Sequence, residues 1–452
     1  MDQPGENNHL ENISKTMYMF RDYMLHVMGF LFFRFTRSLV VTFQKFTWAI
    51  TGVLRIRRDA KRGLNFKQSA HVTEIYWRRK FLPMLVADPS NFITLHKGFK
   101  HPSYVLKPHI SLYCMTREEA VFVETPEEIS IITKSHKNLP LYQIQFEKAV
   151  RVITMPLASF HKIASDVGNP RIPVIWLSST GHCGSTLLSN MFRRVPGMAL
   201  FAEPDVITTL GFLWKNKSLQ QGEYEQLLAS AVRLLCKPDD QAGIVCVKTR
   251  PCATRLMEDI MRMFPKIRTI FMYRNSMKTV SSYLALHQMD PAPHAMRFIM
   301  DNNVMSTILP FFRTIVYDNY AKVNEKEIAS LKPSKISSVG IYTAAWAAAV
   351  ARCNDCREKG YPVLPIIFED LMKDPRQSCA VLFGLLDIRK EYLTMALEAF
   401  KVDVQRGTKL LVITETKRTI SQEHRAEANA ILKKYGLPKL GERYEVTGLV
   451  KF

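Results

Sequence analysis

The sequence contains few cysteines, and none are grouped in a way that would hold a metal. Its eight cysteines in 452 residues are too sparse for a disulfide scaffold. Cys353-x-x-Cys356 is the only close pair, and neither a second pair nor a histidine pair completes a zinc site nearby, so we expect no metal. Apolar residues make up 47% of the chain and charged residues 23%. These values exclude a disordered chain and a polytopic membrane protein.

Acidic residues are also scarce relative to basic ones. The chain has 62 Lys and Arg against 41 Asp and Glu, which gives a formal net charge of +21. Such a surface favours anionic partners, which include phosphate or sulfate esters, polyanionic glycans, acidic lipids and nucleic acid. At about 150 residues per domain, the length predicts two or three domains.

The N-terminal segment, residues 1–62, has no clean apolar run of the length that spans a membrane. Two shorter runs, 24–33 and 38–54, are separated by Arg34 and Arg37, and a basic cluster follows at 55–62. A spanning helix needs about 20 apolar residues. The segment could therefore form two amphipathic helices on the protein, a membrane-associated interfacial or hairpin-like segment, or a single span. We expect membrane association through residues 18–62, at the Golgi or at the cytoplasmic face; no cleavable signal peptide is indicated.

Residues 63–170 form a β-rich extension in our interpretation. Short β-forming runs recur at 105–106, 110–113, 121–123, 129–132, 142–146 and 150–153, with turn signals between them. From residue 171 to 452 the pattern becomes an alternation of strands and helices. This alternation predicts an α/β fold with a parallel sheet flanked by helices, in which ligands bind beyond the carboxyl ends of the strands.

A glycine-containing turn follows the first apolar run of that region. Residues 174–177 end in Ser178-Ser179-Thr180-Gly181-His182-Cys183-Gly184-Ser185-Thr186, and a helical pattern then begins. Glycines permit a tight turn, and the N–H groups at a helix start attract anions. The turn is not a Walker A loop, because Ser185 stands where that loop has lysine. We therefore predict a phosphate-binding turn that is unsuited to Mg-nucleotide chemistry.

Further candidates follow at the ends of the next strands. Glu203 ends an apolar stretch and is a candidate general base, while Asp205 precedes an apolar run and is interpreted as a helix cap. Lys248 ends the run 244–247. Arg274 ends another strand, and Ser282 lies eight residues later, so both could face one phosphate.

Together these residues resemble the sulfotransferase family that uses 3′-phosphoadenosine 5′-phosphosulfate (PAPS), nearest to its tyrosylprotein and carbohydrate branch. Residues 182–186 look like the family's [KR]-x-G-[ST]-T loop, and Arg274 with Ser282 matches the spacing of its 3′-phosphate motif. Residues 367–375 are similar to its late [YF]-E-D-L-x-x-[DE]-P segment. The resemblance covers residues 172–410 and does not extend to the N-terminal region.

The resemblance implies a P-loop NTPase-like sulfotransferase fold and PAPS as co-substrate, without a metal. It implies that Glu203 acts as base and that Lys248 and His182 stabilise developing charge. It also implies an acceptor hydroxyl or amine on a carbohydrate, a protein tyrosine or a lipid, and no nucleic-acid partner. The cofactor-binding residues it implies are Gly181, His182, Cys183, Gly184, Ser185, Thr186, Arg274 and Ser282.

Two departures from the family keep an alternative open. His182 stands where the family has Lys or Arg, and Arg250 stands where the cytosolic branch has its catalytic histidine. An arginine cannot serve as a base at neutral pH, which shifts that role to Glu203. A catalytically silent module that binds PAP or another anion at a membrane is the alternative function. A small-molecule kinase is less favoured, because the Walker lysine is missing.

Overall fold

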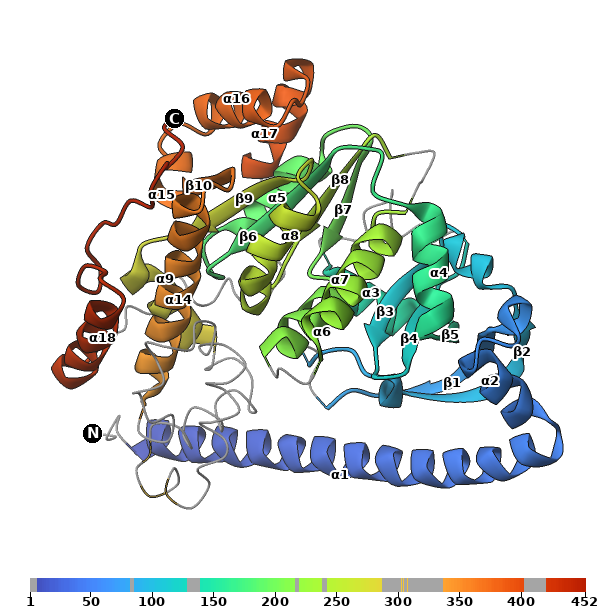
Figure 1. Ribbon diagram of the computed structural model, residues 1–452. Coiled ribbons are helices and arrows are strands. Elements are labelled where there is room, and N and C mark those ends of the chain that lie inside the picture. The colour runs from blue at the N-terminus through green and yellow to red at the C-terminus, as the bar shows by residue number, and fades with distance from the viewer. Residues whose placement is uncertain are drawn as a thin grey trace.

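The computed structural model describes residues 6–81, 85–127, 139–215, 219–237, 242–286, 302, 304, 307, 336–401 and 420–452. In this part of the chain the strands form two five-stranded sheets, and a long N-terminal helix runs along one edge of the molecule (Figure 1).

The first sheet is antiparallel and has the strand order β2-β1-β5-β4-β3. Helices α3 (Leu141–Lys148) and α4 (Leu157–Val167) flank β5 in the sequence. The strands are β1 (Ala70–Arg78), β2 (Phe92–Lys100), β3 (Ile110–Met115), β4 (Glu119–Glu124) and β5 (Arg151–Pro156). Short 3-10 turns lie at Phe66–Gln68, Pro89–Asn91 and Pro102–Leu106.

Some of the strands expected in this region are found and others are wrong. Strands include 110–113, 121–123 and, of the run 150–153, residues 151–153, whereas 129–132 lies outside the described residues. Residues 142–146 are helical, because Leu141, Ile144 and Gln145 bury one face of a helix that begins after Pro140. Residues 105–106 belong to a 3-10 turn that begins at Pro102. Strands β1 and β2 were not expected.

The second sheet is parallel and has the strand order β10-β9-β6-β8-β7. The chain leaves the central strand β6 toward β7 and β8 on one side, and later adds β9 and β10 on the other. The point between β6 and β9 is therefore the topological switch point, beyond which ligands bind in such sheets. The strands are β6 (Val174–Ser179), β7 (Met198–Ala202), β8 (Ile244–Lys248), β9 (Arg268–Tyr273) and β10 (Val363–Ile367).

Helices cover both faces of the parallel sheet, as the strand–helix alternation predicts. Val174 and Trp176 of β6 pack in one core with α4, α6 and α7, while Ile175 and Leu177 pack in another with α5, α16 and α17. The first core also contains Phe122 of the antiparallel sheet, so the two sheets share it. The helices are α5 (Ser185–Arg193), α6 (Asp205–Lys215), α7 (Gln221–Leu235), α8 (Met257–Met263), α9 (Ser276–Leu286), α14 (Ser338–Glu358), α15 (Phe368–Leu371), α16 (Pro375–Leu385), α17 (Leu393–Lys401) and α18 (Gln422–Lys434), with 3-10 turns at Pro251–Leu256 and Lys390–Tyr392.

The N-terminal segment is one long helix and a short one. The first apolar run and residues 38–50 of the second belong to α1 (Glu6–Ile50). The end of the second run passes Gly52, whose φ is +77°, and enters α2 (Val53–Lys61). The alternative in which these runs form two separate helices is wrong, because the arginines between the runs are good helix formers and α1 continues through them. Within α1, the 27 residues Met24–Ile50 are long and apolar enough to cross a membrane by length and composition.

One face of α1 packs on the antiparallel sheet. Phe33 is fully buried and meets the ring of Trp77 edge-on, with the ring centroids 5.1 Å apart. Arg37 Nε donates to the carbonyl of Phe92 at 3.1 Å, and Gln44 Nε2 donates to the carbonyl of Thr94. These contacts fix α1 along β1 and β2.

Candidate active site

The turn between β6 and α5 adopts left-handed backbone conformations at three positions. Gly181, His182 and Gly184 have φ of +75°, +47° and +84°. Thr180 N donates to the Met272 carbonyl at 3.1 Å, and Cys183 Sγ donates to the same oxygen at 3.3 Å. Strand β9 thus holds the turn at the switch point of the sheet.

Both glycines of this turn are also required by close packing. A Cβ at Gly181 would lie 2.0 Å from Tyr283 Oη, and one at Gly184 would lie 2.3 Å from the ring of Phe368. Gly184 is the N-cap of α5, and no side chain in the described part of the chain caps this helix. The N-terminal N–H groups of α5, with the positive end of its dipole, therefore form an anion-binding environment.

Lys248 connects the residues at the ends of three neighbouring strands. Its Nζ donates to Thr186 Oγ1 at 3.0 Å and to Glu203 Oε1 at 2.8 Å. The Lys248 side chain is 6% exposed and that of Glu203 is 26% exposed. The β7–β8 register pairs Ala202 with Lys248, and Glu203 N donates back to the Lys248 carbonyl at 2.6 Å. The structure therefore brings together a hydroxyl, an ammonium and a carboxylate beside the turn.

Glu203 has a lowered pKa. Burial alone would raise it, but Lys248 and Arg250 outweigh that effect, so the pKa lies below its ordinary value of 4.5. Arg250 Nε lies 3.8 Å from Glu203 Oε2. Partial desolvation, which could tune a carboxylate toward the working range of a general base, therefore does not raise the pKa of Glu203 in this structure. In this arrangement Glu203 is a carboxylate stabilised by two cations.

Asp205 has a larger structural role than its interpretation as a helix cap. It is the first residue of α6 and is fully buried. Its carboxylate lies 2.9 Å from Arg250 Nη2 and 3.6 Å from Lys80 Nζ, and it accepts the N–H of Ala87 at 2.8 Å. The cap interpretation is wrong, because this carboxylate binds groups from the first sheet region and from beyond β8. In the sequence, a shared spacing is the signal for this charge cluster. Glu203 and Asp205 are separated by one residue, and so are Lys248 and Arg250.

His182 and Ser282 lie together on the other side of the turn. His182 Nδ1 and Ser282 Oγ are 2.8 Å apart, and the His182 ring lies 4.1 Å from the ring of Tyr283, centroid to centroid. Ser282, from helix α9, therefore lies against the turn for which the sequence predicts phosphate binding.

Arg274 directly follows β9 and contacts the segment that follows β10. Its guanidinium lies 5.0 Å from the ring centroid of Phe368, and its Nε lies 3.7 Å from Glu369 Oε1. Since Phe368 also packs against Gly184, this ring contacts both Arg274 and the turn. Glu369 further accepts the N–H of Asn275 at 3.4 Å.

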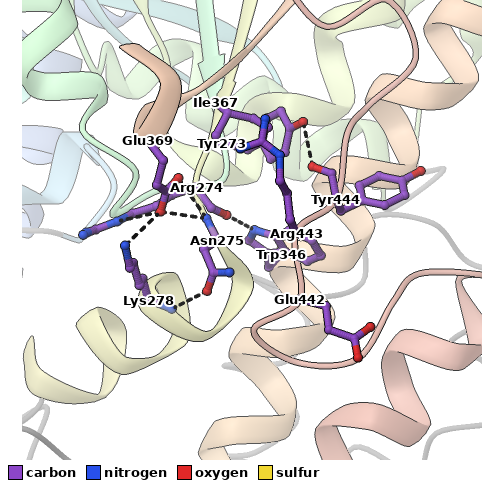
Figure 2. A pocket seen from close by; sticks show the side chains of 10 residues that line it. All are labelled: Tyr273, Arg274, Asn275, Lys278, Trp346, Ile367, Glu369, Glu442, Arg443 and Tyr444. Atoms are coloured by element: carbon purple, nitrogen blue, oxygen red, sulfur yellow. Dashed lines mark hydrogen bonds and ion pairs between the residues drawn. The ribbon is translucent and has the colours of Figure 1, made fainter. Parts of the chain in front are cut away.

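A cavity of about 130 Å³ lies on the β9–β10 side of this arrangement (Figure 2). The Glu369 carboxylate lies there among Arg274, Lys278 and Asn275. The cavity is smaller than the few hundred Å³ typical of ligand pockets, so it cannot enclose a nucleotide. Its lining consists of Tyr273, Arg274, Asn275, Lys278, Trp346, Ile367, Glu369, Glu442, Arg443 and Tyr444.

The described residues contain no group of three or more His, Cys, Asp or Glu side chains that could hold a metal ion. The eight cysteines are all buried and unpaired with one another.

Comparison with known proteins gives no family match. No protein-family model matches the chain, and no curated protein matches it. Similar solved structures include the sulfotransferase STF9 from Mycobacterium avium, at 10% identity and a TM-score of 0.35, over 62% of this chain and 81% of that one. A sulfotransferase from Alicyclobacillus acidocaldarius is similar at 15% identity and a TM-score of 0.30, over 58% and 92%. Both TM-scores are below 0.5.

Proposed function

We propose that this protein is a sulfotransferase that moves a sulfonate group from PAPS to a hydroxyl or amine of an acceptor. The observation that carries the proposal is the position of Lys248, which bridges Thr186 at the N-terminus of α5 and the carboxylate of Glu203. Sulfonate transfer requires an anion site, a cation beside the transferred group and a proton acceptor. These three groups meet here at neighbouring strand ends.

The residues of the turn fit the phosphosulfate end of this donor. Gly184 leaves the start of α5 without a side-chain cap, and Ser185 and Thr186 add hydroxyl donors. On the other side, Arg274 and Ser282 would hold the 3′-phosphate, which requires them to exchange their present partners Glu369 and His182. A phosphate is a stronger partner for Arg274 than a carboxylate oxygen 3.7 Å away.

Glu203 would accept the proton that the acceptor loses. In the structure its pKa is held low by Lys248 and Arg250. An anion bound at the start of α5 would compete for Lys248 and add negative charge near Glu203, and both effects raise the pKa of the carboxylate. Lys248 would then stabilise the negative charge on the transferred group and on the leaving phosphate. Donor binding would thereby prepare the base.

A catalytically silent PAP-binding module is the second candidate. Two observations favour it: His182 replaces the lysine or arginine of the family's loop, and the lowered pKa of Glu203 weakens it as a base. A neutral imidazole supplies no fixed charge to the phosphosulfate.

Calorimetric titration of the full chain with PAP, PAPS and ATP, with and without Mg²⁺, tests these functions. We expect PAP and PAPS to bind without Mg²⁺, and we expect PAPS to be converted to PAP when glycan, tyrosyl-peptide or lipid acceptors are supplied. Lys248→Met should lose turnover and weaken the binding of PAPS more than that of PAP. Binding without turnover on any acceptor would support the silent module, and Mg-dependent preference for ATP would refute both functions.

A further inference from the structure

One face of α1 is apolar and exposed along its whole C-terminal half. Met28, Phe32, Phe35, Leu39, Phe43 and Phe46 are each 57 to 68% exposed. Their spacing of three or four residues places them on one side of the helix. We call these six residues the apolar stripe. At 100° per residue, the stripe lies opposite Phe33, Arg37 and Gln44, which pack on the antiparallel sheet.

Basic side chains accompany the stripe. Arg34 and Lys45 of α1 are also exposed, and long cationic side chains can reach lipid headgroups. Arg55, Arg58 and Arg62 are exposed on and directly after α2, which follows α1. The C-terminal end of α1 is therefore followed directly by a concentration of exposed positive charge.

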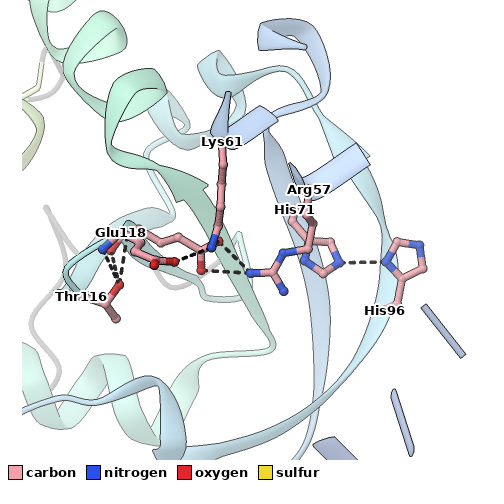
Figure 3. A network of polar contacts seen from close by, with 7 residues as sticks. Arg57, Lys61, His71, His96, Thr116 and Glu118 are labelled. Carbon is pink, nitrogen blue, oxygen red and sulfur yellow. Dashed lines mark hydrogen bonds and ion pairs between the residues drawn. The ribbon is translucent and has the colours of Figure 1, made fainter. Parts of the chain in front are cut away.

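Helix α2 is held rigidly at the end of α1. Arg57 Nη2 donates to Glu119 Oε1 at 2.7 Å, and Lys61 Nζ donates to Glu118 Oε2 at 2.6 Å (Figure 3). Arg57 and Lys61 thus attach α2 to the end of the β3–β4 hairpin, and the other arginines of the cluster stay exposed.

We propose that α1 lies in the plane of an anionic membrane surface, with the apolar stripe inserted among the lipid chains and the α2 arginines at the headgroups. Exposed apolar area beside basic residues is the pattern of interfacial helices. This inference is independent of the proposed enzymatic function, because none of its residues belongs to the candidate active site.

The same helix is poorly suited to span a bilayer. Residue 37 is the midpoint of the apolar segment Met24–Ile50, so a spanning orientation would place Arg37 at the bilayer centre. It would also remove Arg37 and Gln44 from the carbonyls of Phe92 and Thr94. Both changes are costly in hydrocarbon.

Vesicle flotation of the full chain tests whether the protein binds an anionic membrane surface. Wild-type protein should float with vesicles that contain phosphatidylserine and bind less to pure phosphatidylcholine. Phe35→Glu with Phe43→Glu should reduce binding to both by about tenfold or more, since two aromatic anchors are lost. Arg55→Gln, Arg58→Gln and Arg62→Gln together should remove the preference for phosphatidylserine.

The matched control is Leu385→Glu with Met395→Glu, which changes two exposed apolar residues far from α1 in sequence and should bind as wild type does. Equal thermal melting would show that each variant is folded. If the glutamate variant in α1 binds vesicles like wild type, the proposal is wrong. It is equally wrong if wild-type protein ignores vesicles and forms a dimer that Phe35→Glu with Phe43→Glu dissociates.

Nitroxide depth measurements separate the interfacial orientation from a span. Because the native cysteines are buried, a nitroxide label should attach selectively to a single introduced cysteine. The four variants to be labelled are Met28→Cys, Phe35→Cys, Phe43→Cys and Ile50→Cys. Residues 28 and 50 are about 33 Å apart along a helix. An interfacial helix places all four labels at similar depth, whereas a central label much deeper than the outer two would show a span and overturn the proposal.

Discussion

Replacing Asp205 with asparagine should strongly destabilise the protein, although this residue is not assigned a catalytic role. Its side chain is 0% exposed, and it neutralises Lys80, at 2% exposure, and Arg250, at 14%. Asparagine keeps an oxygen for the N–H of Ala87 but removes the charged carboxylate beside both cations, and Lys80 loses the acidic partner that lies 3.6 Å away, whereas Arg250 keeps Glu203. Breaking a buried ion pair on one side costs about 3–5 kcal/mol, and we expect Asp205→Asn to fall in that range.

Urea unfolding at constant pH measures this cost, and a surface ion pair provides the matched control. Arg268 Nη2 lies 2.6 Å from Asp387 Oδ2, but the two side chains are 54% and 74% exposed. Asp387 has a φ of +56°, which asparagine also tolerates. Asp387→Asn should therefore cost at most about 1 kcal/mol. If both variants lose the same stability, the argument from burial is refuted.

A second measurement tests whether Lys80, once it has lost the carboxylate of Asp205, causes the loss of stability. Burial already lowers the pKa of Lys80, and loss of Asp205 would lower it further. A folded-state pKa below the unfolded value of 10.5 means that the folded protein releases this proton first, so stability rises as pH increases toward 10.5. The difference in the free energy of unfolding between the wild-type protein and Asp205→Asn should therefore become smaller at alkaline pH. When Lys80→Met is added to Asp205→Asn, it should also lower the free energy of unfolding by less than it does in the wild-type protein.

Three predictions concern the proposed chemistry. Glu203→Gln should lower acceptor-dependent turnover about 10²–10⁴-fold with PAPS affinity retained, and near wild-type turnover would exclude Glu203 as the base. Arg274→Ala should weaken PAP binding by about 2–3 kcal/mol in calorimetry, because it removes a charge-assisted phosphate contact; an unchanged affinity in a folded variant would contradict the 3′-phosphate assignment. His182→Ala should weaken PAPS more than PAP, and an equal loss for both ligands would place His182 outside the phosphosulfate site.

The sequence predicts the parallel sheet well because its strands are buried on both faces. Such strands are nearly continuous apolar runs, as in β6 and β8, and each is followed by a helical pattern. Strand β1 is harder to predict, because polar residues such as His71, Thr73 and Glu74 interrupt it. His71 is nevertheless buried, where burial lowers its pKa to about 3, and it bonds to His96 at 2.8 Å as a neutral ring.

The N-terminal helix shows a different limit of sequence interpretation. Arg37 and Gln44 look like interruptions of an apolar segment when the sequence is scanned for runs. In the helix they lie on the face that meets the sheet, where backbone carbonyls of β2 accept their hydrogen bonds. The apolar stripe on the opposite side of the same helix is then uninterrupted. Only the position of a neighbouring sheet reveals this division between a protein face and an apolar face.

The charge cluster around Asp205 links the first sheet region to the candidate active site. Lys80, Ala87 and Tyr142 come from residues 63–170, and each contacts Asp205 or Arg250; the Arg250 guanidinium lies 4.2 Å from the Tyr142 ring centroid. Arg250 in turn lies near Glu203, and its charge helps to keep the pKa of that carboxylate low. Because these residues are far apart in the sequence, their contacts cannot be predicted from the sequence alone. The antiparallel region therefore helps to set the electrostatics at the carboxyl ends of β7 and β8, and a change at Lys80 should alter the pKa of Glu203 through Asp205 and Arg250.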